Sequence, residues 1–157
     1  MDLSYPKSVS VVIPAYNEED SIYEVVCNTC EHLPAYFDDY EVIVVNDGST
    51  DQTQKILDQL VDELDGLRII QQSNCGFGRA MVTGILAASK EFTAYLPADG
   101  QFLVPDMRHC FELLEGSDLV LGYRGGRSDY TITRIIMSYG YLTLLTLLFG
   151  IKYMDVG

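Results

Sequence analysis

The sequence predicts an α/β fold in which a mostly parallel sheet carries helices on both faces. Short β-branched runs alternate along the chain with longer segments whose core-facing residues recur at helical spacing. Such alternation is typical of strand-helix-strand units, whose crossover helices bring successive strands into one parallel sheet. The 157 residues fit a single domain over residues 1–157, since domains usually contain about 100 to 200 residues.

The first strand-helix-strand unit occupies the first third of the chain. Residues 8–13 (SVSVVI) and 41–45 (EVIVV) are β-branched runs of the length expected for buried strands. A helix is predicted between them over residues 22–33, and Pro34 ends its pattern. The core-facing positions of this helix follow the helical period: Ile22, Val25, Val26, Thr29, Cys30 and Leu33. The two strands are therefore expected to lie in one sheet and to run parallel.

The same alternation continues to residue 122. The remaining elements are predicted as helix 56–64, strand 67–70, helix 78–89, strand 92–96, helix 105–114 and strand 118–122. Pro105 suits the first turn of its helix, because the N–H that proline lacks would have no partner there. In a sheet of this kind, ligands bind beyond the carboxyl ends of the strands.

A long apolar segment lies near the end of the sequence. Residues 135–151 contain 17 uncharged residues, which only reaches the lower limit of a transmembrane helix. We interpret the segment first as a buried helix, second as an interfacial helix beside a lipid, and third as a membrane span. If exposed, it would promote self-association.

The acidic charge of the chain excludes one large class of partner. Lys and Arg number 10 against 23 Asp and Glu, which gives a net charge of −13. Residues 1–65 hold 15 acids and 2 bases, whereas residues 66–157 hold 8 of each. A protein of this charge is not expected to bind nucleic acid, which attracts basic surfaces.

Neither the N-terminus nor the cysteines indicate secretion. The first residues lack a basic segment followed by an apolar one, so they do not form a secretory signal, and we expect the protein in the cytoplasm. Cys27 and Cys30 form a C-x-x-C inside a predicted helix, and no second Cys/His pair completes a zinc site. We therefore expect both to be reduced thiols that face the core.

Polar loops follow four of the predicted strands. They are Pro14–Glu18, Asn46–Asp51, Pro97–Gln101 and Tyr123–Arg127. Taken singly, each loop could be ordinary turn chemistry, with Ser49 or Asp51 capping the next helix. Together at one edge of a sheet they favour a binding site, because a scaffold needs turns there but not this set of functional groups.

The charges of these loops indicate what such a site would bind. Acids at Glu18, Asp47 and Asp99 would lie at the same edge as Arg124 and Arg127. Carboxylates bind divalent cations, and guanidinium groups bind phosphate oxygens. The combination suits a ligand that brings both phosphates and a divalent metal ion.

Four ordered motifs resemble a known family. Residues 11–19 (VVIPAYNEE), 44–51 (VVNDGSTD), 74–80 (NCGFGRA) and 97–101 (PADGQ) are similar in order and spacing to the family 2 glycosyltransferases. Within that family they most resemble the dolichyl- and polyprenyl-phosphate sugar synthases. The resemblance implies a GT-A fold with a Rossmann-like sheet, and a catalytic domain that is incomplete at the C-terminus.

The resemblance also implies an activity. Such an enzyme transfers a hexose, with inversion, from a GDP- or UDP-sugar to a polyprenyl or dolichyl phosphate, with Mg²⁺ or Mn²⁺ as cofactor. It would work at the cytoplasmic face of the membrane as a peripheral protein. The nucleotide-sugar residues implied are Pro14, Tyr16, Glu18, Val45, Asp47, Ala98, Asp99, Gln101 and Arg124. Asp99 and Gln101 would hold the metal, Asp99 and Arg124 would be catalytic, and Arg127 and Arg134 would bind the acceptor phosphate.

One departure from the family pattern leaves alternatives open. The family often has Asp-x-Asp where this chain has Pro97 in place of the first Asp. Pro97 and the missing C-terminal part together suggest one alternative, a nucleotide-sugar binding module without turnover, in which these 157 residues alone need not be active. Another is a transferase that acts on a glycan hydroxyl. A phosphate acceptor needs no general base because it is already an anion, and we find no convincing base in the sequence.

A glycine motif between the third strand and the next helix has two interpretations. Gly76 and Gly78 begin like a dinucleotide-binding G-x-G-x-x-G, but the third glycine is missing and the motif follows the wrong strand. It forms either a tight turn that lets the chain approach the donor or simply the start of a helix.

Overall fold

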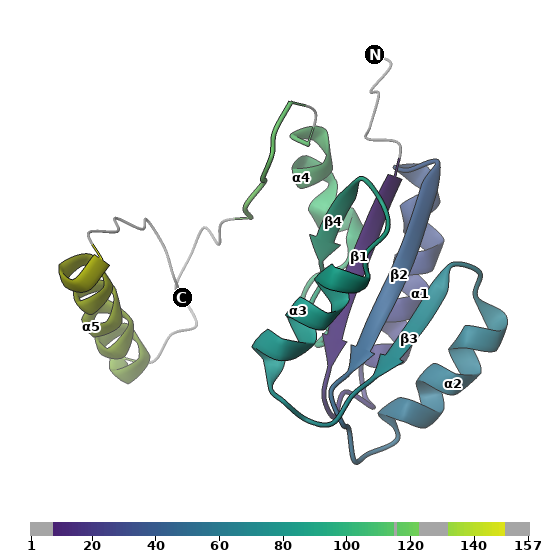
Figure 1. The fold of residues 1–157 in the computed structure, drawn as a ribbon, viewed down its shortest axis with the longest axis horizontal. Helices are drawn as coiled ribbons and strands as arrows, with labels where there is room; N and C mark the ends of the chain where they lie inside the picture. The colour runs from purple at the N-terminus through teal and green to yellow at the C-terminus, as the bar shows by residue number, and fades with distance from the viewer. Residues whose placement is uncertain (1–7, 115, 123–131, 150–157) are drawn as a thin grey trace. The chain divides into compact units, whose positions relative to one another are not determined.

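The computed structural model describes residues 8–114, 116–122 and 132–149 (Figure 1). The chain divides into two compact units, Met1–Val120 and Leu121–Gly157. The first unit contains the sheet, and the second contains helix α5 (Ile132–Phe149). The interpretation of the whole chain as one catalytic domain stays a prediction.

The first unit is built on a four-stranded parallel sheet. Its strands are β1 (Ser8–Ala15), β2 (Asp39–Asn46), β3 (Leu67–Gln71) and β4 (Phe92–Tyr95). The strands lie in the order β3-β2-β1-β4, and every neighbouring pair is parallel. The predicted α/β fold with a parallel sheet is therefore confirmed. The direction of chain progression reverses at β1, which is the topological switch point where ligands bind in such sheets.

Helices connect the strands and cover both faces of the sheet. They are α1 (Ile22–His32), η1 (Leu33–Ala35), α2 (Thr53–Glu63), α3 (Phe77–Ala87), η2 (Val104–Met107) and α4 (Arg108–Glu112). The helix predicted over 105–114 is thus a 3₁₀ turn followed by a short α-helix. Figure 1 shows α3 on one face of the sheet and α1 on the other.

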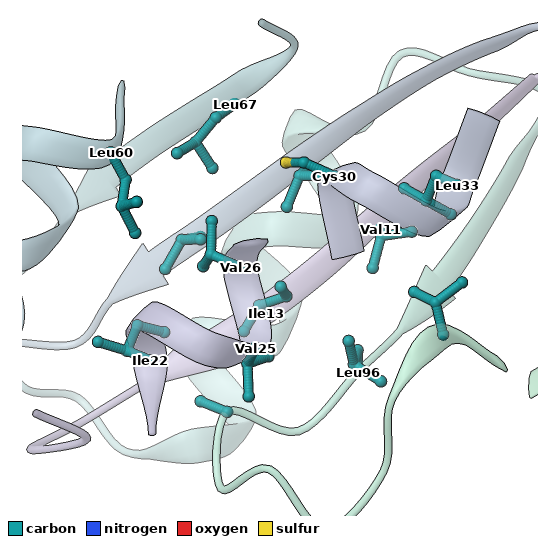
Figure 2. Packing of buried hydrophobic residues seen from close by; sticks show 14 of the residues in the cluster. Val11, Ile13, Ile22, Val25, Val26, Cys30, Leu33, Leu60, Leu67 and Leu96 are labelled. Carbon is teal, nitrogen blue, oxygen red and sulfur yellow. The ribbon is translucent and has the colours of Figure 1, made fainter. Parts of the chain in front are cut away.

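The main core lies between α1 and the sheet (Figure 2). Alternate residues of β1, Val11 and Ile13 among them, point toward Val25 and Val26 of α1, and all four are fully buried. On the other face, Ile43 and its neighbours pack beneath α3. Because both faces are covered, β1 and β2 are continuous apolar runs rather than alternating ones.

Helix α3 approaches the sheet closely at Gly84. A Cβ at this position would overlap a methyl group of Val12 and would lie 3.2 Å from a methyl group of Val45. Glycine is needed here because of space, since its backbone is helical. The absence of a side chain lets α3 rest directly on β1 and β2.

A buried carboxylate ties the amino end of the sheet together. Glu41 accepts hydrogen bonds from Ser10 Oγ (2.7 Å), from the N–H and Oγ of Ser89 (both 2.7 Å) and from Arg68 Nη1 (2.6 Å). Burial alone would raise the pKa of this carboxyl, but the hydrogen bonds outweigh burial and lower the pKa of Glu41 to about 2. The ionised group therefore joins β1, β2, β3 and the segment that precedes β4.

One expectation about residues 118–151 is not met. Residues 118–122 form no strand, and Leu119 and Leu121 are 72% and 79% exposed. An apolar run becomes a strand only where a neighbouring strand takes its hydrogen bonds. Within the second unit, the side chains of α5 that the structure describes are exposed, Leu144 and Leu147 among them, and the buried helix stays a prediction. An apolar helix buries its side chains only against a partner surface.

The expectations about α5 stay predictions. These are the buried helix, the interfacial helix and the self-association. Within the described ranges, no helix has the length and hydropathy needed to cross a bilayer.

The cysteines of α1 are free thiols, as expected. Cys30 is 7% exposed and belongs to the core, while Cys27 is partly buried against it. Burial, together with the neighbouring Cys27, raises the pKa of Cys30 to about 11. The Cys30 thiol is therefore a neutral core group, not a redox nucleophile.

The Gly84→Ala variant tests the close approach of α3 to the sheet. We expect it to be about 1 to 3 kcal/mol less stable than the wild type in urea denaturation, because the added methyl overpacks the core. Gly78→Ala is the matched control, since a Cβ there meets nothing within 4 Å. That variant should be unchanged or up to about 1 kcal/mol more stable. Equal effects of the two substitutions would contradict the packing argument.

The Glu41→Gln variant tests the buried carboxylate. The folded pKa of Glu41 lies below its ordinary value of 4.5, so its ionised form stabilises the fold above that pH and loses this effect as the pH falls toward 2. We expect the variant to lose about 2 to 3 kcal/mol of unfolding free energy at pH 7, and the difference from wild type to shrink below about pH 4.

Glu24, an exposed residue of α1, gives the control for charge alone. Glu24→Gln should change the unfolding free energy by less than about 0.5 kcal/mol at either pH. A Glu41→Gln deficit that is constant between pH 7 and pH 3 would show that the charge of Glu41 has no stabilising role.

Candidate functional site

The carboxyl ends of the strands meet at one edge of the sheet. Ala15 lies opposite Asn46, and Asn46 lies opposite Gln71, so β1, β2 and β3 end level with one another. The loops that follow them open on the same side, toward the bottom of the first unit as drawn in Figure 1. This is the edge at which the sequence predicts a site.

A cavity of about 310 Å³ lies among these loops. Its lining comes from the loops after β1, β2 and β3 and from the first turns of α3: Pro14, Ala15, Tyr16, Glu18, Asp47, Asn74, Gly76, Phe77 and Ala80. Pro14, Tyr16, Glu18 and Asp47 were predicted as site residues, and the fold brings them together here. The volume is at the small end of the range for ligand pockets, which suits a compact ring system rather than a whole extended ligand.

The cavity is acidic. The charged residues among its lining are Glu18 and Asp47, and no Lys or Arg is present in this set. Ionised carboxylates only accept hydrogen bonds, so the cavity favours ligand groups that donate them, such as ring N–H and sugar hydroxyl groups. A bare phosphate would be repelled.

Asp47 is the most constrained side chain of the cavity. It is 3% exposed and accepts hydrogen bonds from Gln72 Nε2 (2.6 Å), the Cys75 N–H (3.0 Å) and the Gly76 N–H (2.8 Å). Burial acts to raise the pKa of Asp47, but these hydrogen bonds outweigh burial and lower it below its ordinary value. Asp47 is therefore ionised and holds the loop after β3 against the loop after β2.

Gly48 allows this close approach of the two loops. Its φ is +73°, and a Cβ at this position would lie 2.7 Å from the backbone nitrogen of Asn74. Both the left-handed backbone and the lack of space require glycine. The Asn-Asp-Gly sequence thus brings the cavity walls together as well as forming a turn.

The loops after β1 and β2 are linked by reciprocal hydrogen bonds. The Asn17 N–H donates to Ser49 Oγ (3.0 Å), and the Thr50 N–H donates back to Asn17 Oδ1 (2.8 Å). The Glu18 N–H donates to Thr53 Oγ1 (2.9 Å) at the start of α2. Asn17 has a φ of 56°, a conformation that asparagine tolerates better than most residues. These bonds fix the position of the wall that carries Tyr16 and Glu18.

The turn interpretation of the 46–51 loop is also correct, although the N-cap residue of α2 is Gln52 rather than Ser49 or Asp51. Asn46 Oδ1 accepts the Ser49 N–H (3.0 Å), which closes the turn, and Asp51 Oδ1 accepts the Thr53 N–H (2.9 Å) in the first turn of α2. Asp51, rather than Ser49, therefore serves the helix. The loop has both a structural role and a place in the cavity.

Two aromatic side chains border the cavity. Tyr16 is 47% exposed and Phe77 is 60% exposed, which is unusual for rings of this size. Phe77 packs edge to face against Tyr95 of β4, with ring centroids 5.8 Å apart. Exposed rings at a cavity offer flat apolar surfaces on which another ring can stack.

Asp99 and Gln101 follow β4, on the other side of β1 from the strands that form the cavity. Both side chains are exposed, and Asp99 Oδ1 accepts the Gln101 N–H (3.0 Å). No group of three His, Cys, Asp or Glu side chains that could hold a metal occurs within the described ranges. One carboxylate and one amide oxygen nevertheless fit the way Mg²⁺ is commonly bound, by one or two carboxylates together with phosphates of the substrate.

Other predicted site residues do not line the cavity. Val45 is fully buried and packs with Ile43 and Ala80, and Ala98 is 3% exposed within the main core. Their proposed contacts with the donor stay predictions. Arg134 lies in α5, in the second unit, and Arg124 and Arg127 lie outside the described residues.

Sequence reasoning missed part of the cavity. Phe77 and Ala80 line it, and Gln72 binds Asp47, although none of the three was predicted as a site residue. Gln72 directly follows β3. The rule that ligands bind beyond the carboxyl ends of the strands could therefore have identified it. Gly76 is the N-cap residue of α3 and donates its N–H to Asp47, so the glycine motif starts a helix, while its approach to the donor stays a prediction.

A family model matches most of the chain. The model of glycosyl transferase family 2 covers residues 10–149. Undecaprenyl-phosphate 4-deoxy-4-formamido-L-arabinose transferase of Pseudomonas fluorescens is 33% identical over 129 residues, which are 80% of this chain and 38% of that protein. The chain thus spans well under half the length of this relative.

Solved structures share the fold. The mannosyltransferase PcManGT from Pyrobaculum calidifontis, in complex with GDP-Man and Mn²⁺, is 29% identical with a TM-score of 0.55, over 62% of this chain and 29% of that one. S. aureus TarS 1-349, in complex with UDP-GlcNAc, is 26% identical with a TM-score of 0.52, over 66% of this chain and 30% of that one. These similarities confirm the predicted GT-A-like α/β fold.

The Gly48→Ala variant tests the contact between the two loops. We expect the amide hydrogens of Cys75 and Gly76 to exchange at least about tenfold faster than in wild type, because the added Cβ pushes Asn74 away and breaks their bonds to Asp47. Gly66→Ala is the control, since Gly66 has a similar φ of +79° but its nearest neighbour would be 3.6 Å from a Cβ. Equal exchange rates in the two variants would show that backbone strain alone causes the faster exchange, and would contradict the role of the contact with Asn74.

Proposed function

The chain belongs to glycosyl transferase family 2, and on that premise we propose that it binds a nucleotide-diphosphate sugar and transfers the hexose, with inversion, to a polyprenyl phosphate. The observation that carries the proposal is the acidic cavity around Asp47. It lies at the carboxyl edge of a parallel sheet, its carboxylates can accept hydrogen bonds from a ligand, and its rim offers Tyr16 and Phe77 for stacking. A nucleoside has the rings and the donor groups that such a cavity binds.

The order of the strands suggests how the rest of the donor would lie. The cavity is built on β1, β2 and β3, and Asp99 follows β4 on the other side of β1. A nucleoside in the cavity would therefore direct its diphosphate across the end of β1 toward Asp99. Gln101 and Arg124 are the further residues proposed to bind the diphosphate.

We propose Mg²⁺ or Mn²⁺ as the metal, held by Asp99 and Gln101. The metal-bound PcManGT complex supports this choice. When bound, such an ion neutralises the negative charge that develops on the leaving diphosphate. Asp99 binds and orients this end of the donor, and the guanidinium of Arg124 is proposed to contact the same phosphates.

The acceptor is proposed from the relative that acts on an undecaprenyl phosphate. Arg127 and Arg134 would bind the acceptor phosphate, whose charge makes a general base unnecessary. An acceptor of this kind is a lipid, so we propose that the protein works peripherally at the cytoplasmic face of the membrane. The activity belongs to the whole protein of the family, of which this chain matches a part.

The Asp99→Asn variant tests the donor and metal site. In calorimetry with GDP- and UDP-sugars, we expect the wild type to bind one of them at least about tenfold more tightly with Mn²⁺ than in excess chelator, because the ion joins two sets of negative charges. Asp99→Asn should remove most of this gain, since it takes away the carboxylate.

Asp65→Asn is the matched control, because Asp65 is an exposed carboxylate at the opposite end of the sheet. It should bind like wild type. Equal affinity in Mn²⁺ and in chelator would overturn the metal assignment. Donor binding without any transfer to polyprenyl phosphate would retain the nucleotide site and overturn the proposed reaction.

A further inference from the structure

The hydrogen bonds of Asp47 leave one acceptor position free. A carboxylate offers about four acceptor positions, two on each oxygen. Oδ1 accepts from Gln72 Nε2 and the Cys75 N–H, and Oδ2 accepts from the Gly76 N–H. Among the residues that the structure describes, no other donor is bound to Asp47. Because Asp47 lines the cavity, a ligand there is the group that would take the remaining position on Oδ2.

A chain of hydrogen bonds from α3 fixes this arrangement. An ionised carboxylate cannot donate, so the amide of Gln72 must turn its NH₂ group toward Asp47. The Gln72 Oε1 atom then faces away and accepts a hydrogen bond from Thr83 Oγ1 of α3 at 2.7 Å. Gln72 and Thr83 are both half-buried. The Thr83 hydroxyl donates to Oε1 and so helps to hold the Gln72 amide in the orientation that Asp47 requires.

We propose that Thr83 and Gln72 are positioning residues that leave Asp47 one acceptor for the ligand, and that the site thereby selects a uracil-type base over guanine. The inference rests on the proposed function, since it concerns the nucleotide of the same donor. The ring edge of uracil presents a single N–H, which one acceptor position satisfies. Guanine presents a ring N–H beside an amino group, and these two adjacent donors need two acceptor positions side by side.

The number of free acceptor positions determines how much more weakly another base would bind. Guanine at the Asp47 carboxylate would bury one donor without a partner, and an unpaired buried donor weakens binding. Cytosine presents a ring nitrogen that is itself an acceptor, and it would face the negative charge of Asp47. We therefore expect UDP to bind at least about fivefold more tightly than either GDP or CDP, which corresponds to about 1 kcal/mol.

The experiment measures the affinities of the chain for UDP, GDP and CDP by calorimetry in one buffer with Mn²⁺. Gln72→Met keeps the length of the side chain but removes its donor, so a second acceptor position opens on Asp47. We expect this variant to bind GDP more tightly than wild type does, while its preference for UDP over GDP narrows about threefold or more. A general loss of structure would weaken both nucleotides and cannot raise the affinity for one.

Two further variants test the contribution of Thr83. Thr83→Val removes the hydroxyl at nearly constant shape and should narrow the UDP preference in the same direction. Thr83→Ser keeps the hydroxyl and should restore the wild-type ratio. Gln71→Met is the matched control, because Gln71 is the exposed neighbouring glutamine at the end of β3, and it should leave the ratio unchanged.

The possible outcomes distinguish failure of the base-selection inference from failure of the proposed function. Tighter binding of GDP than of UDP by the wild type would overturn this inference and leave the proposed function intact. A UDP to GDP ratio that is unchanged in Gln72→Met and Thr83→Val would overturn the positioning role. Failure of all nucleotides and nucleotide sugars to bind would overturn the proposed function, and this inference with it.

Discussion

Parallel pairing of β1 with both β2 and β4 is the constraint on which the rest of the structure depends. It places the central strand between two neighbours and between two layers of helices, so that β1 must be apolar on both faces. It also brings the polar ends of the strands to one edge, where segments far apart in the sequence meet. The need for glycine at position 84 follows from the same constraint, because α3 can pack closely on β1 only where a side chain is missing.

Strand β2 carries a buried carboxylate near each end, and the two have different roles. Glu41, near the amino end, is surrounded by donors from three other segments and joins the sheet at a distance from the cavity. Asp47, just beyond the carboxyl end, also organises a neighbouring loop but retains an open position toward the cavity. Hydrogen bonds keep both groups ionised although they are buried, so charge can be held inside this fold either for stability or for binding.

The sequence predicts the parts of the structure that depend on local pattern. The alternation of strand and helix patterns identifies all four strands, and the polar loops after β1 and β2 identify Tyr16, Glu18 and Asp47 at the cavity. The prediction of a strand at 118–122 was wrong, because an apolar pattern does not reveal whether a partner strand is present. The link from Thr83 through Gln72 to Asp47 could not be predicted, since it depends on where α3 crosses the sheet and on side-chain rotamers.

The reciprocal bonds between the loops after β1 and β2 have a consequence for the thermodynamics of binding. Asn17, Ser49 and Thr50 hold these two loops together through bonds that lie within the protein itself. The loss of conformational entropy that ordering requires therefore accompanies folding rather than association. A ligand that enters this cavity meets preorganised walls, so more of its contact energy is expressed as affinity.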